Sequence, residues 1–575
     1  MSIAPNASTV NPHFWYRQPS PPLPSWYAHS STNYRNHKVF NLRYLIHSDV
    51  RCNDGTRAGY YVRRSKDLRS KNWLIYLEGG WYCFDEATCI SRQITNHALF
   101  SSRTWHMNRY IGGVLSWDER INPNYHNYNI LFVPYCSSDL WSGKKRERTG
   151  GYYFHGSRIL TAVIDDLLRQ PDFFHADKVV FAGSSAGGIG VMLNIDRLAR
   201  RLRRRLRYLR GNRPSKRLQV SGLVDSAWFL NYPTYAQPYS GSCTSIYDCP
   251  PEEGILRGIG LWQPRIPRRC RMAQGKKNFY KCYLGPIIYP HIRTPTFIIQ
   301  SLFDEAQLQM SRALLLTGGS FSKLAYIQNL GRAIAKSLDT VQGVFAPACT
   351  DHEILTTNHW AQLMVDSQSL HDTLNAWDEH LNRWRTFPYW YFHLQSPQSP
   401  YRGRESSQQD DSLQEAHQSQ QPQMNSSMIF LSKLVAVLNR PKTDKTAMRG
   451  GKVNANKRTL RDVLHITQPY HSRVIDRCSL DVGPEDETSI DGFPTSVLGN
   501  LAAACAGRSH MTPLCNPSCR ALTHPRTMER LSVVSLYELY GVDSAQLAAN
   551  VGVSVSRLKA LPVKTQMRML FCRPV

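Results

Sequence analysis

The sequence predicts an α/β fold in which a mostly parallel β-sheet is covered by helices on both faces. Between residues 41 and 385, short apolar runs alternate with segments of helical periodicity. The runs are apolar throughout, which is typical of strands buried on both faces of a sheet. We expect strands at 73–77, 129–133, 179–182, 219–224 and 296–300, and an amphipathic helix at 158–169.

The most informative motif is Gly183-Ser184-Ser185-Ala186-Gly187, which lies between the strand expected at 179–182 and a long helical segment. The glycines two positions before and after Ser185 permit a strained turn that lifts the serine hydroxyl above the sheet. A strand, a tight turn and a helix in this order form the nucleophile elbow of the α/β-hydrolase fold. We therefore predict that Ser185 is a catalytic nucleophile. The alternative is a small-residue turn at which a helix and a strand pack closely.

A serine hydroxyl needs a general base, normally a histidine that a carboxylate orients. In α/β-hydrolases the acid and then the histidine follow the serine along the chain. Asp225 and Asp304 both follow expected strands, but Asp225 comes one strand too early. We predict Asp304 as the acid and interpret Asp225 as a structural carboxylate. His352 lies in a loop beyond Asp304 and is favoured as the base over His359, which we expect in the following helix.

An oxyanion hole needs N–H donors from the residue after the nucleophile and from an early strand–helix loop. Ala186 supplies the first donor. The second is expected from LEGGWY at 77–82, where a strand ends in two glycines that permit close approach of the backbone. The alternative is an ordinary Gly-Gly turn. This chemistry needs no metal and no organic cofactor.

The chain is strongly basic, since 70 Lys and Arg against 43 Asp and Glu give a net charge of +27. This favours a polyanionic partner, and because no DNA- or RNA-reading motif is present we expect no nucleic acid. Eleven cations and no acid lie at 197–217, around an apolar stripe of Leu198, Leu202, Leu206 and Leu209. We expect a sulfated or phosphorylated polyanion to bind there, at Arg200, Arg203, Arg204 and Arg207. A solvated basic helix face is the alternative.

Fourteen cysteines, an even number, favour disulfides in an oxidising compartment and hence a secreted protein. The short spacings predict Cys83–Cys89, Cys243–Cys249 and Cys270–Cys282. Cys515 and Cys519 are expected in disulfides rather than in half of a metal site, since no matching knuckle accompanies them. No stretch reaches the length of a transmembrane helix. Residues 1–40 carry no signal peptide, so we expect that the natural N-terminus is missing.

The composition divides the chain into four parts. We expect a disordered N-terminal segment at 1–40, a catalytic domain at 41–385 and a disordered, low-complexity insertion or linker at 386–500. A small Cys-containing helical module follows at 501–575, with helical periodicity at 533–539 and 547–561.

Several segments together resemble the pectin acetylesterase family, and within it the branch of carboxylesterases that remove palmitoleate from Wnt proteins. They are LEGGWYCF at 77–84, VPYCSSDLWSG at 133–143, AGSSAGGIGVMLNIDR at 182–197, LFDEAQL at 302–308, YIQNLGR at 326–332 and FAPACTDHEI at 345–354. The chain departs from the family at Ala376, where a cysteine is expected, and at Tyr283-Leu284, where two phenylalanines are expected.

The resemblance implies a catalytic triad of Ser185, Asp304 and His352 and oxyanion donors at Gly80, Trp81 and Ala186. It implies an acyl pocket lined by Trp81, Tyr82, Phe229, Ile259, Tyr283, Leu284, Ala306 and Met310. The implied activity is hydrolysis of the O-palmitoleoyl serine ester of lipidated Wnt proteins, with heparan sulfate on glypicans as the polyanion. The alternatives are an O-acetylesterase acting on glycans and a non-catalytic protein that binds Wnt or glycosaminoglycans.

Overall fold

The computed structural model of the protein describes residues 37–211, 218–235, 243, 245–246, 249–315, 319–384, 472–478, 511–513, 515–520, 530–551 and 553–571. Most of the N-terminal segment expected at 1–40 and most of the linker expected at 386–500 lie outside these residues. The bounds of the expected domains therefore stay predictions. Within the linker range, a short described segment contributes one strand to the main sheet.

The central element is a ten-stranded sheet with the order β12-β9-β8-β7-β6-β3-β5-β2-β1-β4. All neighbours from β12 to β5 pair in parallel, and the remaining pairs are antiparallel. The strands are β1 Phe40–Tyr44, β2 Gly59–Arg63, β3 Asn72–Leu77, β4 Asn108–Arg109, β5 Asn129–Val133, β6 Lys178–Ser184, β7 Gln219–Asp225, β8 Thr296–Ile299, β9 Gly343–Ala346 and β12 Arg473–Ile475. The five expected strands and the mostly parallel fold class are confirmed.

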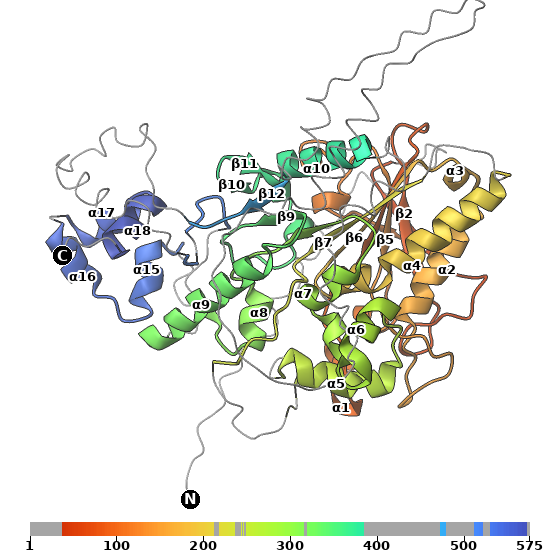
Figure 1. The fold of residues 1–575 in the computed structure, drawn as a ribbon, viewed down its shortest axis with the longest axis horizontal. Coiled ribbons are helices and arrows are strands. Elements are labelled where there is room, and N and C mark those ends of the chain that lie inside the picture. Colours follow the sequence, from red (N-terminus) through yellow and green to blue (C-terminus); the bar gives the residue numbers. More distant parts are fainter. Residues whose placement is uncertain are drawn as a thin grey trace, which may run out of the picture. The chain divides into compact units, whose positions relative to one another are not determined.

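Helices lie on both faces of this sheet (Figure 1). They are α1 Glu86–Thr95, α2 Gly156–Leu167, α3 Pro171–Phe174, α4 Ala186–Leu209, α5 Pro251–Trp262, α6 Arg268–Asn278, α7 Gly285–Ile288, α8 Glu305–Met310, α9 Phe321–Ser337 and α10 Leu370–Trp384. Phe297 of β8 packs on Trp377 of α10, with ring centroids 5.7 Å apart. The preceding Thr296 points to the opposite face, where Ile195 of α4 packs. The sheet is therefore the middle layer of three.

Helix α4 carries the arginine-rich segment and lies beside α2 (Figure 1). Leu198, Leu202 and Leu206 are buried as expected. Leu209 is 46% exposed, so the expected stripe of four leucines is wrong at its last member, because the final turn of α4 runs past the core. Asp165 of α2 supplies the acid that the segment lacks, since its carboxylate accepts two hydrogen bonds from Arg201.

The disulfides expected from short spacings are all present. They are Cys83–Cys89, Cys243–Cys249 and Cys270–Cys282, and three longer bridges join Cys52–Cys136, Cys349–Cys519 and Cys478–Cys515. Cys515 and Cys519 are thus in disulfides, as expected, and not in a metal site. Among the described residues no helix is both long and apolar enough to cross a bilayer.

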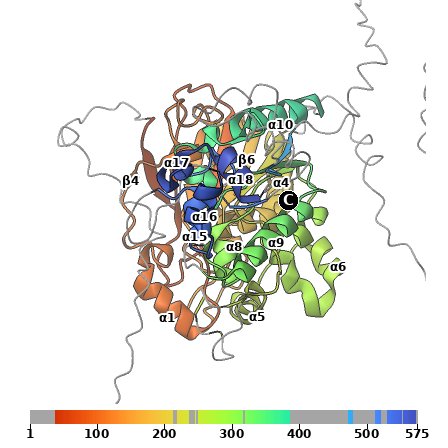
Figure 2. The same ribbon diagram turned by 90° about the vertical axis from the view of Figure 1, so that its left-hand side faces the viewer.

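The C-terminal helices are α15 Val533–Glu538, α16 Ser544–Asn550, α17 Val555–Ala560 and α18 Val563–Phe571, which group together in Figure 2. The single helix suggested by periodicity at 547–561 is therefore two helices. The chain leaves helical geometry after Asn550, and Ser554 starts α17 by accepting a hydrogen bond from the N–H of Arg557. Tyr540 connects this group to the rest of the chain, because its hydroxyl donates to the carbonyl of Leu315 at 2.7 Å.

Two glycines near the start of α4 pack so closely on neighbouring residues that neither position has room for a side chain. A Cβ at Gly187 would overlap the carbonyl oxygen of Leu77, and a Cβ at Gly190 would lie 2.5 Å from Cδ1 of Trp141. These contacts bring the start of α4 against the end of β3.

We expect Gly187→Ala to lower the free energy of unfolding by about 1–3 kcal/mol, because the added methyl must displace backbone. The matched control is Gly260→Ala in α5, where a Cβ meets nothing within 4 Å. That substitution should stabilise the protein by about 0.5–1 kcal/mol through helix propensity. Thermal or denaturant unfolding measures both changes, and equal effects at the two positions would contradict the packing argument.

Candidate active site

Ser185 stands at the junction of β6 and α4 in a strained conformation. Its φ of 54° and ψ of −124° fall in a region that residues other than glycine rarely adopt. Its N–H donates to the carbonyl of Asp225 on β7 at 2.9 Å, which holds the turn against the sheet. A Cβ on Gly183 would lie 2.6 Å from the carbonyl carbon of Gly187, so both glycines of the motif are needed for the turn to close. The geometry is that of a nucleophile elbow.

The structure brings Asp304 and His352 together. Asp304 follows β8, is fully buried and caps α8 by accepting hydrogen bonds from the N–H groups of Ala306 and Gln307. Nδ1 of His352 lies 2.9 Å from both carboxylate oxygens of Asp304. An imidazole held at Nδ1 keeps Nε2 for proton transfer, which is the arrangement of acid and base in a serine hydrolase.

Asp225 and His359, the alternative acid and base, are placed differently from Asp304 and His352. The hydrogen bonds of the Asp225 carboxylate come from Ser184, Ser226 and Leu355. His359 precedes a short 3₁₀ turn at Trp360–Gln362. The geometry therefore favours Asp304 and His352, and the role of each residue stays a prediction.

Burial acts to lower the pKa of His352, but the carboxylate of Asp304 and its hydrogen bond raise it. Glu353 and Asp225 add smaller contributions in the same direction, and the net pKa is about 9. Asp304 thus stabilises the imidazolium, the state that forms when neutral His352 takes the proton of Ser185.

The segment expected to supply the second oxyanion donor approaches the nucleophile closely. A Cβ on Gly79 would lie 3.0 Å from Cβ of Ser185. Gly80 and Trp81 follow with φ of 123° and 55°, and a Cβ on Gly80 would lie 2.6 Å from Cδ1 of Leu99. Such strain at a non-glycine residue costs about 1–3 kcal/mol and persists where surrounding contacts hold it. Ala186, the other expected donor, is the first residue of α4.

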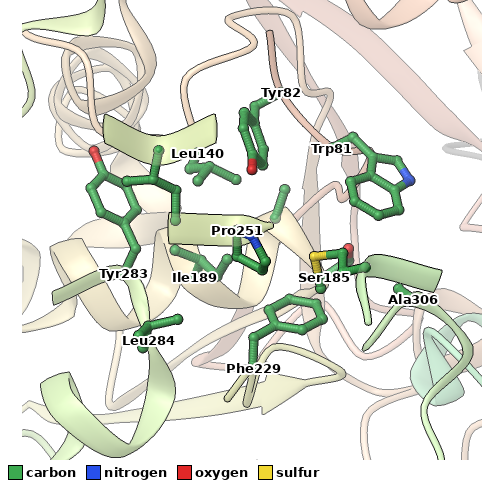
Figure 3. Close-up of a pocket in the computed structure, with 13 residues that line it drawn as sticks. Trp81, Tyr82, Leu140, Ser185, Ile189, Phe229, Pro251, Tyr283, Leu284 and Ala306 are labelled. Atoms are coloured by element: carbon green, nitrogen blue, oxygen red, sulfur yellow. The ribbon is translucent and has the colours of Figure 1, made fainter. Parts of the chain in front are cut away.

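A cavity opens at Ser185, with about 440 Å³ of space free of protein atoms when the open solvent at its mouth is included (Figure 3). Its lining is largely apolar. The lining residues are Trp81, Tyr82, Leu140, Ser185, Ala186, Ile189, Phe229, Pro251, Ile255, Tyr283, Leu284, Ala306 and Met310. The Tyr283 hydroxyl is engaged outside the lining, since it donates to Ser142 at 2.7 Å.

Seven of the eight pocket residues implied by the resemblance line this cavity, and Ile259 does not. On α5 the lining residues are Pro251 and Ile255, one turn apart, and Ile259 lies on the next turn, beyond the cavity. A role for Ile259 in acyl binding therefore stays a prediction that this cavity does not support. Ile189 was missed, although its position one turn after Ser185 on the elbow helix would have identified it. Leu140 was missed as well, and nothing in its local sequence marks it.

The four arginines expected to bind a polyanion are not equivalent. Arg200, Arg204 and Arg207 are exposed and follow the helical spacing of one face of α4. Arg203 is half-buried, and its Nε donates to the carbonyl of Leu218.

The electrostatics of His352 predict an alkaline pH dependence. Its pKa of about 9 lies above the ordinary 6.5, so neutral imidazole, the form that acts as a base, should increase as the pH rises towards 9. We expect kcat/KM for ester hydrolysis to rise from about pH 7 to about pH 9. Asp304→Asn should lower kcat by about 10⁴-fold and move the midpoint to lower pH. A wild-type midpoint at the ordinary pKa of histidine would contradict this account.

Comparison with known proteins agrees with this geometry. The sequence profile of the family described as Pectinacetylesterase matches residues 31–388. The palmitoleoyl-protein carboxylesterase NOTUM of Schmidtea mediterranea is 43% identical over 546 residues, which cover 94% of this chain and 91% of that protein. The human protein of the same name is 42% identical over 59% of this chain and 66% of its own length. The palmitoleoyl-protein carboxylesterase NOTUM of Drosophila melanogaster is 37% identical over 59% of this chain and 48% of its own length. The chain belongs to the pectinacetylesterase family.

Proposed function

We propose that this protein is a palmitoleoyl-protein carboxylesterase that hydrolyses the O-palmitoleoyl serine ester of Wnt proteins and so lowers Wnt signalling. The observation that carries the proposal is the apolar cavity that opens at the hydroxyl of the elbow serine. Its relatives named palmitoleoyl-protein carboxylesterase, at 37–43% identity, support the same acyl group.

In the proposed reaction, Oγ of Ser185 attacks the ester carbonyl while Nε2 of His352 takes the hydroxyl proton. The N–H of Ala186 and the turn at Gly80–Trp81 stabilise the oxyanion. The C–O bond to the protein serine breaks, and His352 returns the proton to that serine, which leaves as an alcohol. Water, deprotonated by His352, then attacks the acyl-enzyme and releases palmitoleate and Ser185. Asp304 holds the imidazolium throughout.

The cavity distinguishes this proposal from acetylesterase activity. An acetyl group needs only a small pocket. Each methylene of a longer acyl chain that is buried against an apolar lining stabilises the complex by about 0.8 kcal/mol, so this cavity favours a long chain. Tyr283 and Leu284 line the side of the cavity that lies away from Ser185 (Figure 3).

We also propose that the protein is secreted and binds heparan sulfate. Twelve of the fourteen cysteines form disulfides within the described residues, which suits an oxidising compartment. The net charge of +27 and the exposed Arg200, Arg204 and Arg207 support attraction to a sulfated polyanion.

Hydrolysis of a palmitoleoylated Wnt peptide tests the main proposal. Wild-type protein should release palmitoleate, and Ser185→Ala should reduce release by about 10⁴-fold or more, because no nucleophile remains. Full suppression of Wnt signalling by Ser185→Ala would instead favour a binding protein.

A pair of variants on helix α5 tests the preference for the length of the acyl chain. Ile255→Phe should lower kcat/KM for octanoyl relative to acetyl esters by about tenfold, because the ring occupies the cavity. Ile259→Phe, one turn further along α5 and outside the lining, should leave the ratio unchanged. A wild-type preference for acetyl over octanoyl esters would contradict the lipid substrate.

Heparin retention tests the basic face. Changing Arg200, Arg204 and Arg207 together to Gln should lower the salt concentration needed for elution from heparin, because three exposed charges are lost. Changing Arg271, Lys276 and Lys277, three exposed cations of α6, removes the same charge elsewhere and should have a smaller effect. If both triple variants lowered the elution salt concentration equally, heparin binding would depend on net charge and not on a site on α4.

A further inference from the structure

Asp225 connects the nucleophile elbow to the histidine loop. It ends β7, is fully buried, and its backbone carbonyl accepts the N–H of Ser185. Oδ2 of its carboxylate accepts a hydrogen bond from Oγ of Ser184 at 2.6 Å. The same oxygen accepts the N–H of Leu355 at 2.9 Å. One side chain thus holds the residue before the nucleophile and the backbone three residues after His352.

Ser226 extends the connection to the residue that follows His352. Its hydroxyl donates to Oδ1 of Asp225 at 3.0 Å and accepts the N–H of Glu353 at 2.9 Å. Ser226 has a positive φ of 50°, a strained conformation that aims its hydroxyl between the two partners. The loop after His352 is therefore fixed at two backbone N–H groups, both through the end of β7.

We infer that Asp225 is a positioning residue that sets the distance between Ser185 and His352 by fastening the loop 353–355 to the nucleophile elbow. The inference rests on the esterase function proposed above. The two carboxylates would then divide the work, since Asp304 orients the imidazole ring at Nδ1 and Asp225 locates the backbone that carries the ring.

The order of strands in the sheet explains why Asp225 can reach both the elbow and the loop 353–355. β7 lies between β6, which leads to Ser185, and β8, which leads to Asp304. The carboxyl end of β7 is therefore the point nearest to both halves of the triad. The hydroxyl of Tyr76 on the neighbouring β3 lies 2.7 Å from Oγ of Ser184, which steadies the donor that Asp225 uses.

If Asp225 acts by positioning the loop, asparagine should replace it, because asparagine keeps the hydrogen bonds. If Asp225 acts through its negative charge, asparagine should not replace it. The carbonyl oxygen of Asp225→Asn can accept both from Ser184 and from the N–H of Leu355, and its amide can donate to Ser226. Burial raises the pKa of Asp225 to about 7, so a neutral side chain at this position is compatible with the fold near neutral pH. Asn should therefore preserve function, and Ala should not.

The experiment compares Asp225→Ala, Asp225→Asn and Ser226→Ala in the full chain, with turnover of p-nitrophenyl octanoate expressed per folded molecule. We expect Asp225→Ala to lose about 100-fold in kcat with KM nearly unchanged, since misplacement of about 1 Å has this effect. Asp225→Asn should remain within about tenfold of wild type, and Ser226→Ala should fall between the two.

The matched control is Asp196→Ala. The carboxylate of Asp196 likewise accepts from three groups, here one hydroxyl and two backbone N–H groups of Thr294 and Arg293, but at the opposite end of the sheet. It should lose stability and keep kcat. If Asp225→Asn fell as far as Asp225→Ala, the charge would be what matters and the inference would be wrong. Retention of kcat in Asp225→Ala would overturn it equally.

Hydrogen exchange separates this inference from the proposed function, because it needs no substrate. The amides of Glu353 and Leu355 should exchange at least about tenfold faster in Asp225→Ala than in wild type, and at the wild-type rate in Asp225→Asn. Unchanged exchange in Asp225→Ala would refute the fastening role. Inactivity of the wild-type protein on every ester, with the expected exchange pattern, would refute the esterase and leave the fastening intact.

Discussion

The candidate site depends on the close approach of helix α4 to strand β3 at the nucleophile elbow. The carbonyl of Leu77 occupies the space in which a side chain of Gly187 would stand, and a side chain on Gly79 would overlap the carbonyl oxygen of Ser184. Because neither position carries a side chain, the hydroxyl of Ser185, the N–H of Ala186 and the turn after β3 share one small volume. A methyl group on either glycine would separate the nucleophile from its expected oxyanion donors.

The parallel order of the sheet collects the remaining groups. Strands β3, β6, β7, β8 and β9 are adjacent and end at one edge. They lead, respectively, to the glycine turn, Ser185, Asp225, Asp304 and the loop of His352. Residues far apart in the sequence thus meet because their strands are neighbours, which is why ligand and catalytic sites of such sheets lie at the carboxyl ends of the strands.

The sequence was sufficient where the signal is local or follows chain order. Apolar runs located five strands, and the glycine spacing located the strained turn at Ser185. The order of strand ends favoured Asp304 over Asp225, and Asp304 is the carboxylate that contacts His352. Tertiary packing decided the rest. Ile255 faces the cavity because Gly254 lets α5 approach Tyr82, which lines the same cavity. The ion pair of Arg201 with Asp165 and the disulfide Cys349–Cys519 join residues far apart in the sequence, so their spacing could not predict them.

Part of the cavity wall comes from a segment that carries none of the expected catalytic groups. The groups that would break the ester lie at the edge of the sheet, where buried strands and hydrogen bonds hold them. Four of the thirteen lining residues, Pro251, Ile255, Tyr283 and Leu284, come instead from the segment 249–284, which two disulfides, Cys243–Cys249 and Cys270–Cys282, constrain. Substitutions in that wall, for example at Tyr283 or Leu284, can reshape the cavity without moving Asp304 or His352. Within this fold, chain-length preference can therefore change while the mechanism of hydrolysis is retained.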